Sequence, residues 1–336
     1  MGDEMNRRYW QVAAGSRGRD YSDLFLKYGL AFVGGDTKVA AMREVRAGDV
    51  MVLKAGLSRI LAAGEVVERN GRHSGCDDKV WLRDFDGWDL RAWCHVDWRR
   101  APSAIETTGL TRATIQIVHQ ASHQAIADEL LLLPPLEIER EPDSTEKVSD
   151  ERILEFLVGE GLRPAAAEEL TNTFRRVRLL AEYYYEKCEW DEIREHETRT
   201  FLIVPLLLAL GWSEQQMKIE LPTEGGRVDL ACFSRAQHHN DADCVMVVES
   251  KDFGSGLDYA PEQARRYASS FPSCRVILVS NGYCYKAFLR DSSGTFSKTA
   301  TAYLNVRDPR DRYPLDPRNV AGALEALRWL LPATVR

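Results

Sequence analysis

The chain has 336 residues, of which 44% are hydrophobic and 28% are charged. This length corresponds to about two domains, and the composition is typical of soluble globular proteins. No apolar run reaches the length of a bilayer crossing, no signal-peptide pattern opens the chain, and the seven cysteines lack paired spacing. We therefore expect a cytoplasmic protein with reduced thiols and no membrane partner. The net charge of −7 arises after residue 133, so bulk charge does not indicate a nucleic-acid-binding protein.

Short apolar runs alternate with turn residues over residues 1–133. This pattern predicts strands, together with one helix over 20–28 that ends at Gly29. The predicted strands cover residues 9–14, 30–34, 50–55, 60–67 and 113–118. We therefore expect the first domain to be a small, strongly curved β-sheet or barrel.

A segment rich in proline and charge follows, over residues 134–150, and its composition is typical of a linker. Helical spacing over 150–158 and 165–187 then predicts two helices. We assign residues 134–189 to a linker and helical connector, and residues 190–336 to a second domain.

The second domain alternates helical and strand patterns. Helices are predicted over 195–210 and 259–270, and strands over 218–221, 227–233, 244–250 and 275–280. The order α-β-β-β-α-β predicts a mixed sheet with helices on its faces, so this domain is of the α/β class.

Two neighbouring strands of this predicted sheet carry charged residues within apolar sequence. Asp229 lies in the alternating strand RVDL, and Glu249 and Lys251 end the apolar run VMVVESK. Residues two apart in a strand share a face, so Glu249 and Lys251 point the same way and Asp229 can meet them from the adjacent strand. Two carboxylates and the Ser250 carbonyl suit Mg²⁺, for which Mn²⁺ is an alternative. A solvated strand edge is the alternative interpretation of an acid-x-Lys pattern.

These residues belong to a longer pattern that resembles PD-(D/E)XK nuclease domains, especially those of type I restriction subunits. The pattern covers residues 190–290 and consists of ETRTFLIVPLLLALGW (197–212), RVDL (227–230), VESK (248–251) and QARRYA (263–268). The resemblance implies a catalytic set of Asp229, Glu249, Lys251, Glu197, Gln263 and Tyr267. It further implies a metal held by Asp229, Glu249, Ser250 and Glu197. Glu195 is an alternative to Glu197, because both lie near the start of the same helix.

Residues 6–131 resemble the PUA-like superfamily, which includes EVE and YTH domains. The stretches that carry this resemblance are RYWQVAAG (8–15), YSDLFLKY (21–28), GLAFVGGD (29–36), AGDVMVL (47–53) and AAGEVV (62–67). The resemblance implies a β-barrel domain that binds a flipped, modified base in a pocket walled by aromatic side chains.

The distribution of tryptophan and arginine is consistent with such a pocket. Aromatic faces stack on bases, and arginines hold phosphates. Five of the eight tryptophans lie in the first 98 residues and are candidates for base binding: Trp10, Trp81, Trp88, Trp93 and Trp98. Four arginines near the first strand are candidates for DNA-backbone binding: Arg7, Arg8, Arg17 and Arg19. Tryptophans also fill small β-cores, which is the alternative.

The two resemblances together predict a modification-dependent DNA restriction endonuclease that senses a modified base and cuts nearby with Mg²⁺. No ATPase motif is present in the sequence, so we expect no ATP requirement. Because one active site cuts one strand, double-strand cleavage requires a homodimer or a transient dimer. The alternatives are an RNA-directed or repair nuclease, and a non-catalytic nucleic-acid-binding protein with a relic nuclease fold.

Overall fold

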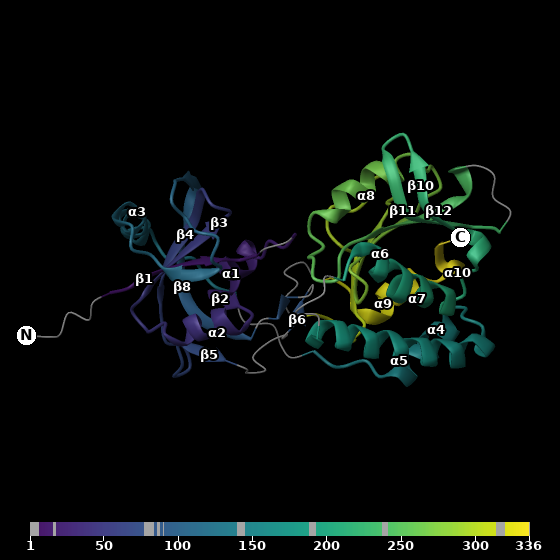
Figure 1. Cartoon of the computed structure of the whole chain (residues 1–336), viewed down its shortest axis with the longest axis horizontal. Coiled ribbons are helices and arrows are strands. Elements are labelled where there is room, and N and C mark those ends of the chain that lie inside the picture. Colours follow the sequence, from purple (N-terminus) through teal and green to yellow (C-terminus); the bar gives the residue numbers. More distant parts are fainter. Residues whose placement is uncertain are drawn as a thin grey trace, which may run out of the picture. The chain divides into compact units, whose positions relative to one another are not determined.

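The computed structural model describes residues 7–15, 18–76, 84–85, 88–89, 91–139, 145–187, 193–236, 241–313 and 320–335. The chain divides into two compact units, Met1–Asp143 and Ser144–Arg336, and each unit contains its own sheet (Figure 1). The boundary between the units falls inside the range 134–189, which the sequence assigns to a linker and connector. Within the described ranges, no helix has both the length and the apolar character that a membrane crossing requires.

The first unit is built around a curved, half-barrel-like sheet. The strands of its main path run in the order β2-β8-β4-β3-β1-β9, with β5 paired to β8. These strands are β1 (Tyr9–Ala13), β2 (Leu30–Val33), β3 (Val50–Ala55), β4 (Arg59–Val66), β5 (Ser74–Cys76), β8 (Ala92–Glu106) and β9 (Ile115–Ile117). A short hairpin joins β6 (Asp84–Phe85) to β7 (Trp88–Asp89). The helices are α1 (Ser22–Tyr28), α2 (Asp36–Arg43) and α3 (Ala121–Leu131).

The strands predicted for the first unit are confirmed within two residues at each end, but the longest strand was not predicted. Strand β8 pairs with β2, β4 and β5 and therefore organises the sheet. Its sequence AWCHVDWRRAPSAIE contains Pro102 and several charges, which disguise the two-residue alternation of a strand. Helix α1 ends where Gly29 adopts a left-handed conformation with φ of 60°.

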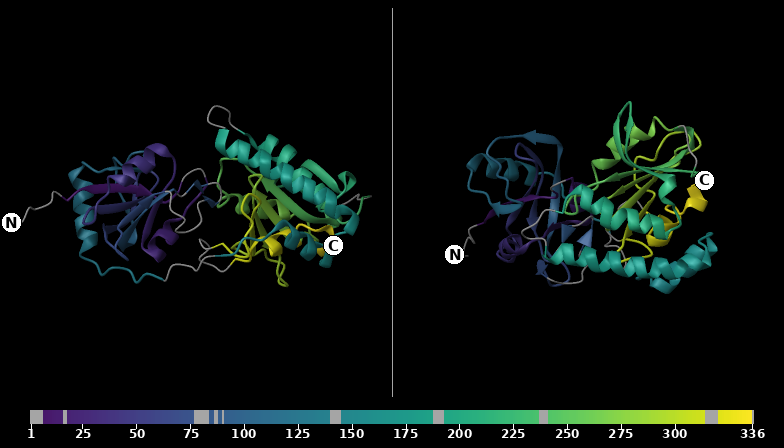
Figure 2. Two further views of the ribbon diagram at one scale, coloured as in Figure 1. Left: turned by 90° about the horizontal axis from the view of Figure 1, so that it is seen from below. Right: turned by 45° about the vertical axis from the view of Figure 1, so that its right-hand side comes forward.

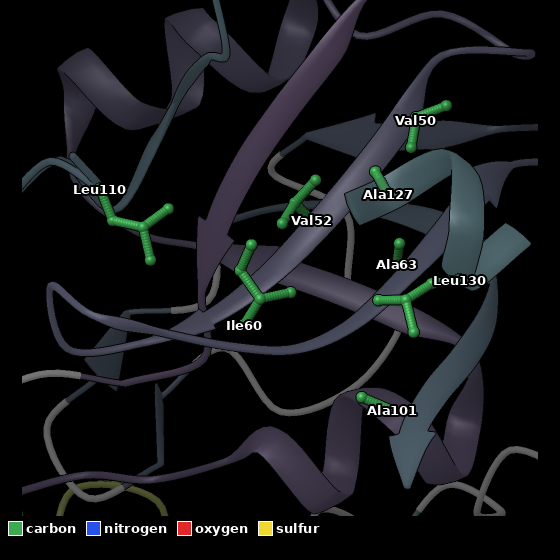
Figure 3. Close-up of a cluster of buried hydrophobic side chains, with 8 residues drawn as sticks. All are labelled: Val50, Val52, Ile60, Ala63, Ala101, Leu110, Ala127 and Leu130. Atoms are coloured by element: carbon green, nitrogen blue, oxygen red, sulfur yellow. The ribbon is translucent and has the colours of Figure 1, made fainter. Parts of the chain in front are cut away.

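One apolar cluster joins the sheet of the first unit to α3, as Figure 3 shows. Val52 and Ile60 come from the adjacent strands β3 and β4, and Leu130 comes from α3. The cluster consists of Val50, Val52, Ile60, Ala63, Ala101, Leu110, Ala127 and Leu130. Burial of these side chains holds the helix against the sheet.

The second unit contains a six-stranded mixed sheet in the order β10-β11-β12-β13-β14-β15. The strands are β10 (Met217–Thr223), β11 (Gly226–Phe233), β12 (Cys244–Ser250), β13 (Val276–Ser280), β14 (Cys284–Leu289) and β15 (Ala302–Asn305). In chain order, the helices and helical turns up to β10 are α4 (Asp150–Gly159), α5 (Pro164–Lys187), α6 (Glu195–Thr198), the π-helical turn η1 (Arg199–Ile203), α7 (Val204–Ala209) and η2 (Glu214–Gln216). Those that follow are η3 (Asp241–Asp243), α8 (Ala260–Ala268), α9 (Ala323–Arg328) and α10 (Pro332–Val335).

Strands β12 and β13 are parallel, whereas the other neighbours in this sheet are antiparallel. Both strands are fully buried, as expected for parallel strands covered on both faces. In Figures 1 and 2, α8 lies on one side of the sheet, and α5, α7 and α9 lie on the other. The predicted order α-β-β-β-α-β is present, and β14 and β15 extend the sheet beyond the prediction.

The expectation of a separate helical connector is corrected by α4 and α5, which belong to the second unit. Helix α5 packs against α7, and its buried side chains include Leu170 and Phe174. The Arg178 guanidinium donates to the Val306 carbonyl at 2.7 Å and pairs with Asp150. The sequence predicts a connector here because helical periodicity does not reveal which surface a helix packs against.

Candidate active site

Strand register brings three acidic residues side by side across β10, β11 and β12. Leu230 pairs with Val248, so the next pair in the register sets Asp229 opposite Glu249. On the other side of β11, Glu220 falls opposite Asp229. The Ser250 amide donates to Asp229 Oδ2 at 2.7 Å, which fixes the carboxylate at the end of β12. Directly opposite residues share a face of a sheet, so these carboxylates converge.

The Glu249 carboxylate is the most deeply buried member of this group, because its side chain is only 1% exposed. Its Oε1 accepts a hydrogen bond from Lys251 Nζ at 2.6 Å. Its Oε2 is buried and has no hydrogen-bond partner among the residues that the structure describes. Burial, followed by the charge of Asp229, raises the pKa of Glu249 to about 7 although Lys251 opposes the shift. A buried oxygen without a donor is unusual in a folded protein and marks this carboxylate for a ligand.

Lys251 follows β12 directly, and its amide continues the parallel ladder by donating to the Ser280 carbonyl at 2.8 Å. Burial on its own lowers the pKa of Lys251, but the hydrogen bond and charge of Glu249, with the charges of Glu195 and Asp229, raise it overall. The side chain is therefore a positively charged hydrogen-bond donor at neutral pH.

Helix α6 adds a fourth carboxylate. The helix is docked beside β12, because Thr198 Oγ1 donates to the Lys251 carbonyl at 3.1 Å and the Glu195 amide donates to Asp252 Oδ1 at 2.9 Å. Ser250 Oγ donates to Glu195 Oε1 at 3.3 Å. Burial and the nearby charge of Asp229 raise the pKa of Glu195. Glu195 is thus a member of the acidic cluster.

This geometry favours Glu195 over Glu197, which the sequence pattern had favoured. Glu197 Oε2 accepts from the Arg194 amide at 2.8 Å and so caps the start of its own helix. Residues two apart on a helix lie on nearly opposite faces. Since Glu195 faces the cluster, Glu197 faces away from it.

Arg199 is a member of the site that the sequence analysis did not single out. Its guanidinium lies 3.2 Å from Asp229 Oδ1 and 3.0 Å from Glu220 Oε1. It also lies 3.8 Å from Glu195 Oε1, four residues earlier in the helix. That i,i+4 spacing of acid and base is visible in the sequence and could have revealed Arg199. Glu220 could not have been found, because it depends on strand register.

Ser250 takes part through its amide and its hydroxyl, and the single hydroxyl hydrogen is shared between Asp229 Oδ2 at 3.0 Å and Glu195 Oε1 at 3.3 Å. Gln263 and Tyr267 bond to each other at 2.9 Å, and Tyr267 packs against Gly226. Because side chains alternate along β11, the face at Gly226 is opposite to that of Asp229. Neither residue hydrogen-bonds to the cluster within the described ranges, so the structure does not bring them into it.

The predicted tryptophan pocket of the first unit is corrected for two of its members. Trp10 and Trp98 are fully buried, and their Nε1 atoms donate to Asp49 Oδ2 at 2.9 Å and to the Leu30 carbonyl at 3.1 Å. Both are core residues with satisfied hydrogen bonds. Trp81 lies outside the described residues, as does the side chain of Trp88.

Trp93 differs from these core tryptophans. It is buried, but its Nε1 has no hydrogen-bond partner in the described part of the chain. The same is true of Nδ1 of His95, whose ring lies edge-on to Trp93 at 4.8 Å between centroids. Burial, followed by the charges of Arg69, Arg72 and His73, lowers the pKa of His95 to about 4, so its imidazole is neutral at physiological pH.

Two of the arginines predicted to bind the DNA backbone form ion pairs with acidic residues of the protein. Arg7 pairs with Glu65 at 3.1 Å on the surface, and Arg8 pairs with the buried Asp49 at 2.8 Å. Arg19 is buried, which is a correction to its predicted exposure to phosphate. Arg17 lies outside the described residues. Of the four, Arg7 is the one whose pairing is easily exchanged for a phosphate, since exposed ion pairs are weak.

The acidic cluster is not arranged as a finished metal cage. Within the described ranges, no group of three or more His, Cys, Asp or Glu side chains surrounds a common metal position. The reason is visible in the contacts: Asp229 gives one oxygen to Arg199 and the other to Ser250. The donor set nevertheless suits a hard divalent cation, because it consists of carboxylate oxygens and includes the unpartnered Glu249 Oε2.

Comparison with known proteins does not assign this chain to a family. No protein-family model matches it, and no curated protein matches it.

Proposed function

We propose that the second unit is a metal-dependent nuclease of the PD-(D/E)XK type, which hydrolyses phosphodiester bonds. The observation that carries the proposal is the buried Glu249, which lies opposite Asp229, bonds to Lys251 through one oxygen, and leaves the other without a partner. A solvated strand edge, the alternative interpretation, is at odds with a carboxylate that is 1% exposed. Burying a charge without full pairing costs stability, which supports a functional reason for keeping it.

Mg²⁺ is the cation that best suits these donors, with Mn²⁺ as an alternative, and Asp229, Glu249 and Glu195 are the residues that would hold it. When bound, such an ion supplies Lewis-acid chemistry: it acidifies water and neutralises phosphate charge. Ser250 holds Asp229 in place through its amide and hydroxyl. Nothing in this scheme requires ATP.

Lys251 is suited to stabilising negative charge rather than to removing a proton. Its raised pKa keeps the ammonium group charged at neutral pH. A charged donor held by Glu249 at 2.6 Å can turn toward a phosphoryl oxygen as negative charge develops there. The role of Lys251 would therefore be electrostatic, with the proton of the attacking water passing to solvent or to a phosphate oxygen.

We further propose that the first unit senses a modified base in DNA, so that the whole chain is a modification-dependent restriction endonuclease. The support that remains is Trp93 with His95, two buried rings with unpartnered nitrogens. A neutral imidazole and an indole N–H can hydrogen-bond to the edge of a flipped base. Because one acidic cluster cuts one strand, double-strand cleavage would need two copies of the chain.

The test of cleavage uses the full chain with Mg²⁺, or with a chelator, on DNA of defined base modification, plain DNA and RNA. We expect Mg²⁺-dependent cleavage of modified DNA. Preferential cleavage of RNA would instead favour an RNA-directed nuclease. The absence of cleavage on every substrate, with no metal bound, would favour a non-catalytic binding protein.

A matched pair of variants tests the assignment of the metal ligands. Glu195→Gln should weaken Mg²⁺ binding about ten-fold, because it removes a charge from the cluster. Glu197→Gln should leave Mg²⁺ binding unchanged and lower stability by less than about 1 kcal/mol, because a glutamine oxygen still accepts from the Arg194 amide. Both are measured by titration calorimetry and thermal melting. The opposite pattern would restore the choice of Glu197.

A further inference from the structure

The Arg199 guanidinium lies where it bridges three of the four carboxylates of the acidic cluster. Its side chain is 5% exposed, and its two terminal nitrogens lie 3.2 Å from Asp229 and 3.0 Å from Glu220. The third carboxylate, that of Glu195, lies 3.8 Å away. A buried cation with three acidic neighbours occupies the position that a metal ion takes in a carboxylate site.

The backbone on both sides of this contact is irregular. The π-helical turn Arg199–Ile203 begins at the arginine, and such turns often mark functional positions in helices. Glu220, at the other end of the ion pair, has a left-handed φ of 53° within strand β10. This conformation is unfavourable for a residue with a side chain. The fold thus holds the Arg199–Glu220 contact at some conformational cost, which a surface ion pair would not require.

The charge of the cluster limits how many divalent cations it can hold. Four carboxylates, Glu195, Glu220, Asp229 and Glu249, face the cationic side chains of Arg199 and Lys251. The exposed Arg227 also pairs with Glu220, but solvent screens its charge. When Arg227 is left out and the other six groups are ionised, the net charge is that of two unpaired carboxylates, which one divalent cation neutralises. A second divalent cation would leave an excess of positive charge beside the buried Glu249 and Arg199 side chains, which is unfavourable.

We propose that Arg199 holds the place of a second divalent cation, so that the cluster binds a single metal ion beside Asp229 and Glu249. This inference rests on the proposed function, because it takes the cluster to be a metal site. The independent observation that points to one ion is the unpartnered, buried Glu249 Oε2, since every other carboxylate of the cluster already contacts Arg199. Arg199 is thus a fixed charge of the site rather than a structural ion pair.

The test is a titration of the full chain with Mn²⁺ alone, in which free Mn²⁺ is counted by electron paramagnetic resonance. The wild-type chain should bind one ion. Arg199→Gln should bind its first ion about ten-fold more tightly, because a neighbouring positive charge is gone, and should take up a second ion. Arg199→Lys keeps the charge and should bind one ion. Arg227→Gln is the matched control: this exposed arginine pairs with Glu220 at 3.2 Å and should not alter binding.

The outcomes separate this inference from the proposed function. Two ions on the wild-type chain, or weaker binding of one ion by Arg199→Gln, would overturn the inference and leave the nuclease proposal standing. No ion on the wild-type chain, with no Mg²⁺-dependent cleavage, would overturn both. If Arg199→Gln does not fold, Glu220→Gln replaces it: this variant keeps Arg199 and must still bind one ion, and two ions would contradict the inference.

Discussion

Each unit contains a buried carboxylate at one end of a strand, and the two carboxylates differ in their hydrogen-bond partners. In the first unit, Asp49 precedes β3 and accepts from Trp10 Nε1 at 2.9 Å, from Arg8 Nη2 at 2.8 Å and from the Arg46 amide at 3.0 Å. In the second unit, Glu249 ends β12 with one oxygen on a lysine and the other without a partner. Asp49 therefore has a structural role, whereas Glu249 keeps one oxygen for a ligand.

The two sheets also differ in the surroundings of a lysine, which is buried in the first unit and half-buried in the second. Burial lowers the pKa of Lys54 in β3, which donates to the Gly56 carbonyl at 3.1 Å. Lys251 is surrounded by carboxylates, and their combined effect raises its pKa. The comparison shows that burial alone does not mark a functional residue. What distinguishes the second unit is burial together with unbalanced charge and an unsatisfied polar atom.

The largest effect should come from Lys251, and Lys54 supplies the matched control. Lys251→Met should reduce cleavage about 100- to 1,000-fold, because it removes a charged donor from the developing negative charge. Lys54→Met should leave cleavage unchanged and shift the unfolding free energy by less than about 1 kcal/mol, since a buried lysine is replaced by an apolar chain of similar length. Single-turnover cleavage and thermal melting check both. Wild-type cleavage by Lys251→Met would remove the lysine from the site.

Asp49 should act on stability alone. Asp49→Ala leaves the Trp10 N–H and the Arg8 charge without their acceptor, so we expect a loss of about 3 kcal/mol in unfolding free energy. Cleavage per folded molecule should be unchanged. Chemical denaturation measures the loss. A variant that is fully stable but inactive would contradict the division between the two carboxylates.

The unfolding free energy should depend on pH through Glu249, because its carboxyl group is buried. Its folded pKa of about 7 lies above the value of about 4.3 for an unfolded glutamate. A raised folded pKa favours folding at low pH, and this contribution is lost as the pH rises through the folded pKa. The metal-free chain should therefore lose about 1 kcal/mol between pH 6 and pH 8 through this residue. Glu249→Gln should lack that loss, and added Mg²⁺ should stabilise the wild-type chain more at pH 8 than at pH 6.

Much of the acidic cluster could be predicted from the sequence, and the members that could not be predicted were missed for the same reason. Asp229, Glu249 and Lys251 were predictable because strand alternation fixes which residues share a face. Glu220 was not, since it enters the site through the register between strands. The choice between Glu195 and Glu197 turned on which face of the helix docks on β12, and periodicity within one helix does not contain that information.

The tryptophans show the same limit of prediction from sequence. Composition placed Trp10, Trp93 and Trp98 in one aromatic set, but two of the three are satisfied core residues. Aromatic content predicts large buried side chains, and only hydrogen-bond partners separate a core ring from a ligand-binding ring. The missing information is therefore tertiary, as it was for the carboxylates.

The smallest effect on stability should be that of Trp93→Phe. Trp93 and Trp98 lie in the same strand, and both are buried, but only Trp98 has a partner for its indole nitrogen. Trp98→Phe should lower the unfolding free energy by about 2 kcal/mol, because it removes volume from the core and leaves the Leu30 carbonyl without its donor. Trp93→Phe also removes volume, but it relieves an unpaired N–H, and the two effects should nearly cancel.

The binding experiment then decides what Trp93 is for. If its indole nitrogen is reserved for a modified base, Trp93→Phe should weaken binding to modified DNA about ten-fold, the loss of one hydrogen bond of about 1.4 kcal/mol. Binding to plain DNA rests on phosphate contacts and should not change. Trp98→Phe is the control, and its selectivity should persist in the folded fraction. Equal affinity of the wild-type chain and Trp93→Phe for modified DNA would leave the first unit without a base-sensing residue among those described, while the acidic cluster of the second unit would be unaffected.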